Sequence, residues 1–149
     1  MNVAEVLTKE RIELNLSAKT KEEALKKLAD ILQKSGALAD EDAFLKDVFA
    51  REQISTTGIG NGIAIPHGKS SSVKETTVAI GRLSDDVEWE SVDDMPVKLV
   101  VLLAVNDADK TGVHVKLLSE MARKLALAKN CERLLSAADA DEIINIFSE

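Results

Sequence analysis

The chain has 149 residues, and its 26 acidic and 19 basic side chains give a formal net charge of −7 at pH 7. A hydrophobic fraction of 45% is enough to fill the core of one domain, which argues against intrinsic disorder. Proteins that bind nucleic acids use basic surfaces and stacking aromatic side chains, whereas this acidic chain has three Phe, one Trp and no Tyr. We therefore expect no nucleic-acid partner.

The sequence also lacks the usual marks of membrane insertion and secretion. No run approaches the roughly 18–20 apolar residues that span a bilayer, and residues 1–16 lack the basic segment and apolar stretch of a secretory signal. A single cysteine, Cys131, excludes an internal disulfide and a cysteine-based zinc cluster. We expect one cytoplasmic domain over residues 1–149, without direct insertion into a membrane.

The first part of the chain predicts one strand and two helices. Residues 11–17 alternate apolar and polar side chains, as a half-buried strand does. A capping box at Thr20 opens an amphipathic helix that ends at Gly36. Asp40 caps a second helix, which fades near Arg51.

The remainder of the chain alternates strands and helices. Strands are expected at residues 63–65, 76–83 and 97–105, with a short edge segment at 87–90. The nearly unbroken apolar run at 97–105 is typical of a central strand covered on both faces. Helices are expected from Val113 to about Lys129, after a cap at Asn130, and after a cap at Asp139.

These elements define the expected fold class. Because strands alternate with helices that can cover both faces of a sheet, the class is α/β. We predict a single-domain three-layer sandwich, in which helices flank a mixed, mostly parallel sheet of about five strands.

Residues 51–69, REQISTTGIGNGIAIPHGK, carry the chemistry. Gly60, Gly62 and Gly68 permit positive φ angles and a close approach of the backbone to a ligand, and successive amides in such a loop can bind an anion. Pro66 and Gly68 flank His67 and restrict its imidazole to a strand end. We therefore predict that these three glycines bind phosphoryl oxygens beside His67.

A neutral imidazole nitrogen is a competent nucleophile toward phosphorus, and nearby donors stabilise the transferred oxygens. The chain has no GxxxxGK[ST] loop for a nucleotide and no HExxH metal motif. Phosphoryl transfer would therefore proceed through the histidine itself, and we expect neither a cofactor nor a metal.

The same segment resembles the phosphohistidine signature of type-2 enzyme IIA domains, the fructose/mannitol/nitrogen-regulatory class of the bacterial phosphoenolpyruvate-dependent phosphotransferase system. Its pattern is filled without a mismatch by Glu52, Ile59, Gly60, Ile63, Ala64, Ile65, Pro66, His67 and Gly68. The resemblance extends over essentially the whole chain, including the stretches TKEEALKKLADIL and HVKLLSEMARKLA.

The resemblance implies an enzyme of the phosphotransferase class that carries a phosphoryl group. His67 would accept the group from the phosphohistidine of HPr and donate it to a cysteine of a separate enzyme IIB component, for sugar uptake. Association with a membrane IIC permease would then run through IIB. The resemblance also makes Arg51 and His114 catalytic residues: Arg51 could bind phosphoryl oxygens in a forked geometry, and His114 could hydrogen-bond near the phosphorylated nitrogen.

Two of these assignments have plainer alternatives. His114 shares a helix face with apolar side chains (Leu117, Leu118, Met121 and Leu125), as a buried core histidine also would. Arg51 could equally be a surface residue of its helix. Thr76 stands where the mannitol branch has a serine, nine residues after the active histidine, and we do not place it in the site. Cys131 is interpreted as a small buried apolar residue.

The function has three candidate versions. The fructose-type transport branch is favoured, and a nitrogen-regulatory IIA protein that controls other proteins is the alternative. A non-catalytic module whose two histidines hold a metal is a distant third, because two histidines supply too few ligands. A phosphoryl group on His67 would add about −1.5 to −2 charges to an acidic chain, so the site must gather cations around it.

Overall fold

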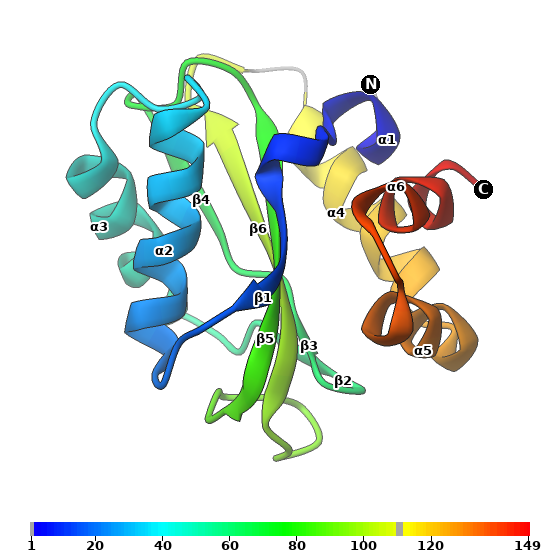
Figure 1. Cartoon of the computed structure of the whole chain (residues 1–149). Helices are drawn as coiled ribbons and strands as arrows, with labels where there is room; N and C mark the ends of the chain where they lie inside the picture. Colours follow the sequence, from blue (N-terminus) through cyan, green and yellow to red (C-terminus); the bar gives the residue numbers. More distant parts are fainter. Residues whose placement is uncertain (1, 110–111) are drawn as a thin grey trace.

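The computed structural model describes residues 2–109 and 112–149, and a mixed sheet lies between two helical layers (Figure 1). One layer holds α2 (Lys21–Lys34) and α3 (Glu41–Glu52). The other holds α1 (Val3–Val6), α4 (Val113–Leu125), α5 (Ala128–Ser136) and α6 (Ala140–Ser148). The predicted three-layer α/β sandwich is confirmed.

The described residues form six strands, one more than expected: β1 (Ile12–Leu16), β2 (Gly58–Gly60), β3 (Ile63–Ala64), β4 (His67–Ser70), β5 (Thr77–Val87) and β6 (Val97–Asn106). Their order is β1-β5-β6-β3-β2, and β4 also pairs with β6. The pairs β1–β5, β3–β6 and β4–β6 are parallel, whereas β5–β6 and β2–β3 are antiparallel.

Strand β6 is the central strand that its apolar sequence predicts. Val100, Leu102 and Ala104 face the core under α2 and α3. The alternate residues Leu99, Val101, Leu103 and Val105 face the core under α1, α4, α5 and α6. Because both faces are buried, β6 fixes the position of the strands that pair with it.

The expected helix starts are confirmed by their caps. The side chains of Thr20, Asp40 and Asp139 each accept a hydrogen bond from the backbone N–H three residues later. The predicted end of α4 near Lys129 is wrong, as is the cap at Asn130. Asn130 lies inside α5. Its side-chain amide donates to the Lys124 carbonyl (2.9 Å), which gives this carbonyl at the end of α4 a hydrogen-bond partner.

The strand predictions also need correction. Strand β5 extends beyond residue 83 to Val87, which pairs with Val97, so there is no separate edge segment at 87–90. Strands β2 and β4 and helix α1 were not expected from the sequence. Both strands are short, and pairing with β3 and β6 stabilises them.

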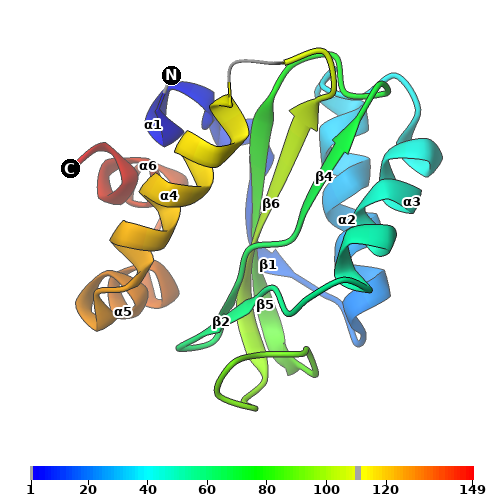
Figure 2. The same cartoon turned by 180° about the vertical axis from the view of Figure 1, so that it is seen from behind.

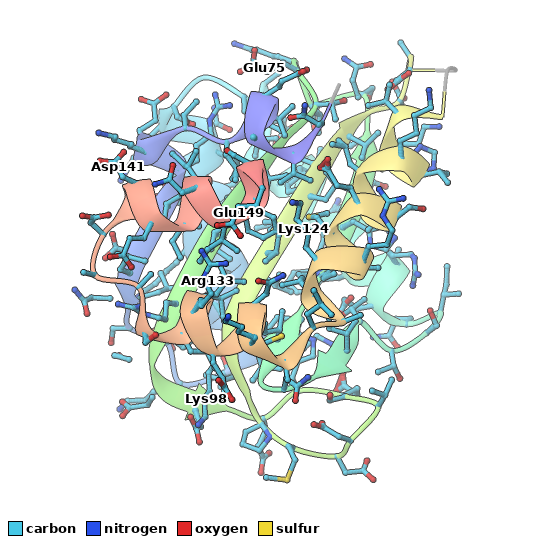
Figure 3. All side chains as sticks on the ribbon, turned by 90° about the vertical axis from the view of Figure 1, so that its right-hand side faces the viewer. Glu75, Lys98, Lys124, Arg133, Asp141 and Glu149 are labelled. Atoms are coloured by element: carbon cyan, nitrogen blue, oxygen red, sulfur yellow. The ribbon has the colours of Figure 1, made fainter. Side chains whose placement is uncertain are left out.

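Figure 3 faces the layer that holds α4, α5 and α6, in which ion pairs hold the C-terminal end of the chain. Arg133 donates to both carboxylate oxygens of Glu149 at 2.7 Å, and Lys9 pairs with Asp141 at 3.1 Å. Lys124 also contacts the Glu149 carbonyl. Within residues 2–109 and 112–149, no helix has the length and apolarity needed to cross a membrane.

Candidate functional site

A break between β3 and β4 places His67. The two strands follow one another along the same edge of β6, and Pro66 in the break has no N–H for the ladder. The Pro66 carbonyl still accepts from the Leu103 N–H (3.0 Å), and regular pairing resumes at His67 opposite Leu103. His67 therefore follows one strand and begins another, midway along β6, whereas the sequence predicts a simple strand end.

The backbone fixes the tautomer of His67. Its Nδ1 lies 3.3 Å from the Ile65 carbonyl oxygen. A carbonyl only accepts, so we assign the ring proton to Nδ1, which leaves the Nε2 lone pair unprotonated. This is the form that a nucleophilic histidine requires.

The surroundings keep the imidazole neutral. Burial lowers the pKa of His67 below its usual value, while the Ile65 carbonyl acts in the opposite direction. Arg51 and His114 lower this pKa further, and the Glu52 carboxylate raises it. Three charged or titratable side chains therefore influence the pKa of His67.

Arg51 lies in the last turn of α3, which packs on β4 (Figure 2). Its Nη1 donates to the Ser55 hydroxyl at 2.9 Å, and the residue is partly exposed. Arg51 therefore lies at the end of the helix that packs on the histidine strand, and its positive charge lowers the pKa of His67.

His114 occupies the first turn of α4 and is half-buried. Leu117, Met121 and Leu125 continue its stripe into the core. Its Nδ1 is buried and has no hydrogen-bond partner within the described part of the chain. His114 thus lies at the start of a buried stripe, and it also influences the pKa of His67.

Gly68 serves the packing of helix on strand. A Cβ atom at this position would lie 2.7 Å from Val48 Cγ2 and 3.0 Å from Phe44 Cε1. The missing side chain therefore lets α3 approach β4, and this approach carries Arg51 toward His67.

Gly60 and Gly62 lie elsewhere. With φ angles of 94° and 80° they flank Asn61 (φ 56°) in the β2–β3 turn, as a tight hairpin requires. The Gly62 carbonyl accepts from the N–H of Lys98, which Figure 3 labels at the lower end of the molecule. Position 62 precedes β3, which starts opposite Leu99, whereas His67 pairs with Leu103, about 13 Å further along β6. The structure does not bring these two glycines to His67.

The anion at this turn belongs to the protein itself. The Asn61 N–H donates to the Asp93 carboxylate at 3.2 Å, and that carboxylate also lies beside Gly60. The glycine-rich stretch therefore separates into a hairpin and a histidine strand with different surroundings.

Sequence reasoning identified Glu52 only as a motif position. Its side chain is 3% exposed and pairs with Lys21 at 2.7 Å. The Thr57 hydroxyl donates to the same carboxylate (2.8 Å) and accepts from the Trp89 indole (3.0 Å). An acidic residue at the last position of a helix, where the helix dipole disfavours it, was the available signal.

Two further residues lie outside the site. The Thr76 hydroxyl accepts from the Asn106 N–H (3.1 Å), so it serves the sheet. Cys131 is buried, and burial raises the pKa of its thiol, which keeps it protonated and unreactive. The described residues contain no group of three or more metal-ligating side chains.

Comparisons with known proteins agree with this fold. Residues 5–149 match the family model described as "Phosphoenolpyruvate-dependent sugar phosphotransferase system, EIIA 2". The chain therefore belongs to this family of phosphotransferase-system EIIA domains.

Individual relatives come from both branches of the family. The chain is 38% identical over its whole length to the fructose-specific EIIABC component of Bacillus subtilis, of which it spans 23%. It is 32% identical to the fructose-specific EIIA component of Haloferax volcanii, covering 99% of this chain and 96% of that protein. It is also 33% identical to a nitrogen regulatory protein of Klebsiella oxytoca, covering 100% of this chain and 91% of that protein.

Solved structures agree with the sequence relatives. The nitrogen regulatory protein IIA-Ntr of Neisseria meningitidis superposes with a TM-score of 0.89 at 30% identity, covering 97% of this chain and 98% of that one. The complex of mannitol enzyme IIA with phosphorylated enzyme IIB from Escherichia coli contains a chain with a TM-score of 0.80 at 25% identity, covering 95% of this chain and 96% of that one.

Proposed function

We propose that this EIIA domain is a histidine phosphocarrier in which His67 accepts a phosphoryl group from phospho-HPr and donates it to a cysteine of an enzyme IIB component. The observation that carries the proposal is the fixed tautomer of His67, with Nδ1 on the Ile65 carbonyl and Nε2 free. Arg51 supplies positive charge that acts on this ring. From these proposed partners we infer that the reaction is cytoplasmic.

The proposed transfer moves the phosphoryl group from one imidazole nitrogen to another. The Nε2 lone pair of His67 forms a bond to phosphorus as the phosphorus–nitrogen bond of the donor phosphohistidine breaks, and that bond's electron pair returns to the donor imidazole. Nδ1 keeps its proton on the Ile65 carbonyl. In the second half-reaction a IIB thiolate attacks phosphorus, and the electron pair returns to Nε2 of His67.

The neighbouring groups stabilise the transferred oxygens. The Arg51 guanidinium can contact two of them in its forked geometry. A proton on the buried Nδ1 of His114 would have no acceptor among the described residues, so we assign the N–H of this ring to Nε2, which makes Nε2 a hydrogen-bond donor. Donors fixed before the reaction favour the charge that develops in the transition state.

The relatives support two physiological roles. Fructose-specific relatives in two organisms favour a transport role with a IIB partner, which the mannitol enzyme IIA–IIB complex also supports. Regulatory relatives support the alternative, in which the phosphorylation state of the domain controls other proteins. A phosphotransfer assay from the phosphorylated domain to a panel of IIB domains separates the two roles. We expect rapid transfer to a fructose-type IIB domain. A phosphoryl group that stays on this protein with every IIB domain would favour the regulatory role.

The site assignment is tested by incubating the protein with phosphoenolpyruvate, enzyme I and HPr. Intact-mass measurement should find one acid-labile phosphoryl group on the wild type and none on His67→Ala. His114→Ala serves as the matched histidine control: it should still accept the group, more slowly, and lose more of its transfer to IIB. Labelling of His67→Ala at the wild-type level would overturn the assignment.

A further inference from the structure

Two buried side-chain atoms in the described part of the chain lack a hydrogen-bond partner, Oε2 of Glu52 and Nδ1 of His114. Native proteins leave few buried polar groups unpaired, and each such group needs a physical reason. Both residues act electrostatically on His67. His114 is proposed to donate a hydrogen bond from Nε2 to the phosphoryl oxygens, whereas the transfer step itself assigns no role to Glu52.

The two oxygens of Glu52 have different surroundings. Oε1 pairs with Lys21 Nζ at 2.7 Å and accepts from the Thr57 hydroxyl at 2.8 Å. Lys21 in turn pairs with Glu90 at 2.6 Å and lies 5.2 Å from the centre of the Trp89 ring. This arrangement holds the carboxylate rigid beside a lysine, and it leaves Oε2 without a donor among the described residues.

The position of Glu52 also runs against local preference. A carboxylate at the last position of a helix meets the negative end of the helix dipole, and burial adds a further cost. Natural proteins retain such exceptions mainly at functional sites. Arg51, one residue earlier, has the charge that this helix end favours.

We infer that Glu52 is a positioning residue for the proposed transfer, and that its buried carboxylate is the counter-charge to the positive ring that His67 becomes on phosphorylation. The ring gains this charge because Nε2 bonds to phosphorus while Nδ1 keeps its proton on the Ile65 carbonyl. The Arg51 guanidinium balances the negative charge of the phosphoryl oxygens, and the Glu52 carboxylate balances the positive charge of the imidazole. The inference rests on the proposed role of His67.

The test compares Glu52→Gln with Glu90→Gln. Both variants remove a carboxylate that pairs with Lys21, but Glu90 is not among the charges that act on His67. In Glu52→Gln the pKa of His67, followed by NMR titration, should fall below that of the wild type. Its phosphorylation equilibrium with HPr should shift toward phospho-HPr by roughly tenfold, the effect of one nearby charge in a partly screened site. Glu90→Gln should match the wild type in both measurements.

Trp89 is the chain's one tryptophan and donates to Thr57, so its fluorescence reports whether the network around Glu52 is intact. If Glu52→Gln alters that emission, the role of Glu52 is tested in the wild-type protein by carbon NMR. The carboxyl carbon resonance of Glu52 should move when His67 is phosphorylated, and that of Glu90 should not.

An unchanged His67 pKa in a folded Glu52→Gln protein would overturn the inference, as would equal effects of the two variants. The titration requires no phosphoryl transfer. A wild type that is never phosphorylated would therefore refute the proposed function, while the pKa comparison would judge the placement of the charge separately.

Discussion

Two short stretches along one edge of β6 contain glycine, yet the structure uses them differently. In the β2–β3 hairpin, Gly60 and Gly62 provide positive φ angles, and the neighbouring carboxylate is Asp93. In β4, Gly68 provides room for α3, and charged side chains surround His67. Glycine content alone therefore does not distinguish the proposed site from a hairpin, whereas a helix packed closely on the histidine strand does.

Removing the charge that α3 brings to β4 should have the largest effect. Arg51→Met should slow phosphoryl acceptance by roughly a hundredfold, because a fixed donor to the developing charge is lost. It should also raise the pKa of His67, since a neighbouring positive charge lowers it in the wild type. Quenched-flow transfer from phospho-HPr and NMR titration provide the two measurements. Lys69→Met, which removes an exposed lysine from β4, is the control. An equal loss of transfer rate in both variants would contradict a specific role for Arg51.

Gly68→Ala should disturb the histidine half of this edge. The added methyl would lie 2.7 Å from Val48 Cγ2, and such overpacking costs about 1–3 kcal/mol of unfolding free energy. Because α3 also carries Arg51, phosphoryl acceptance should slow in the folded fraction. Urea unfolding and transfer rates together check this prediction, and wild-type stability would show that α3 does not need the close approach.

Gly60→Ala should disturb only the hairpin half. The φ angle of 94° strains any residue with a side chain, at a cost of roughly 1–2 kcal/mol. The rate of phosphoryl acceptance per folded molecule should equal that of the wild type. A rate that fell along with the stability would return Gly60 to the phosphoryl-binding role and would break the comparison.

The smallest effect expected is on the pH dependence of stability. The folded-state pKa of His67 lies below the usual 6.5, chiefly through burial, so the unfolded chain binds more protons between the two values. The contribution of His67 to stability should therefore decline as pH falls from 6.5 through the folded-state pKa and level off below it. Urea unfolding of wild type and His67→Gln across this range isolates the contribution. A wild type that gained stability relative to His67→Gln on acidification would have the opposite sign.

The fold was predictable where the signal is local. The caps at Thr20, Asp40 and Asp139 and the apolar run of β6 each depend on neighbouring residues, and each appears as expected. Strands β2 and β4 escaped prediction because each is short and forms by pairing with residues far along the chain.

The candidate site was predictable to a similar extent. The run of residues before His67 singles out that histidine, whereas a glycine-rich stretch gives the same signal for a hairpin turn and for an anion-binding loop. The surroundings of Glu52 depend on Lys21, 31 positions earlier, and on Trp89, 37 positions later. No spacing within the motif encodes those contacts.

In the proposed transfer, Nε2 of His67 carries the phosphoryl group, while Nδ1 keeps its proton and donates it in a hydrogen bond to the Ile65 carbonyl. Imidazole nitrogen NMR of the protein, before and after phosphorylation by phospho-HPr, tests it most directly. We expect a neutral, Nδ1-protonated His67 that gains phosphorus coupling at Nε2 alone. Phosphorus coupling at Nδ1 of His67, or at either nitrogen of His114, would contradict it.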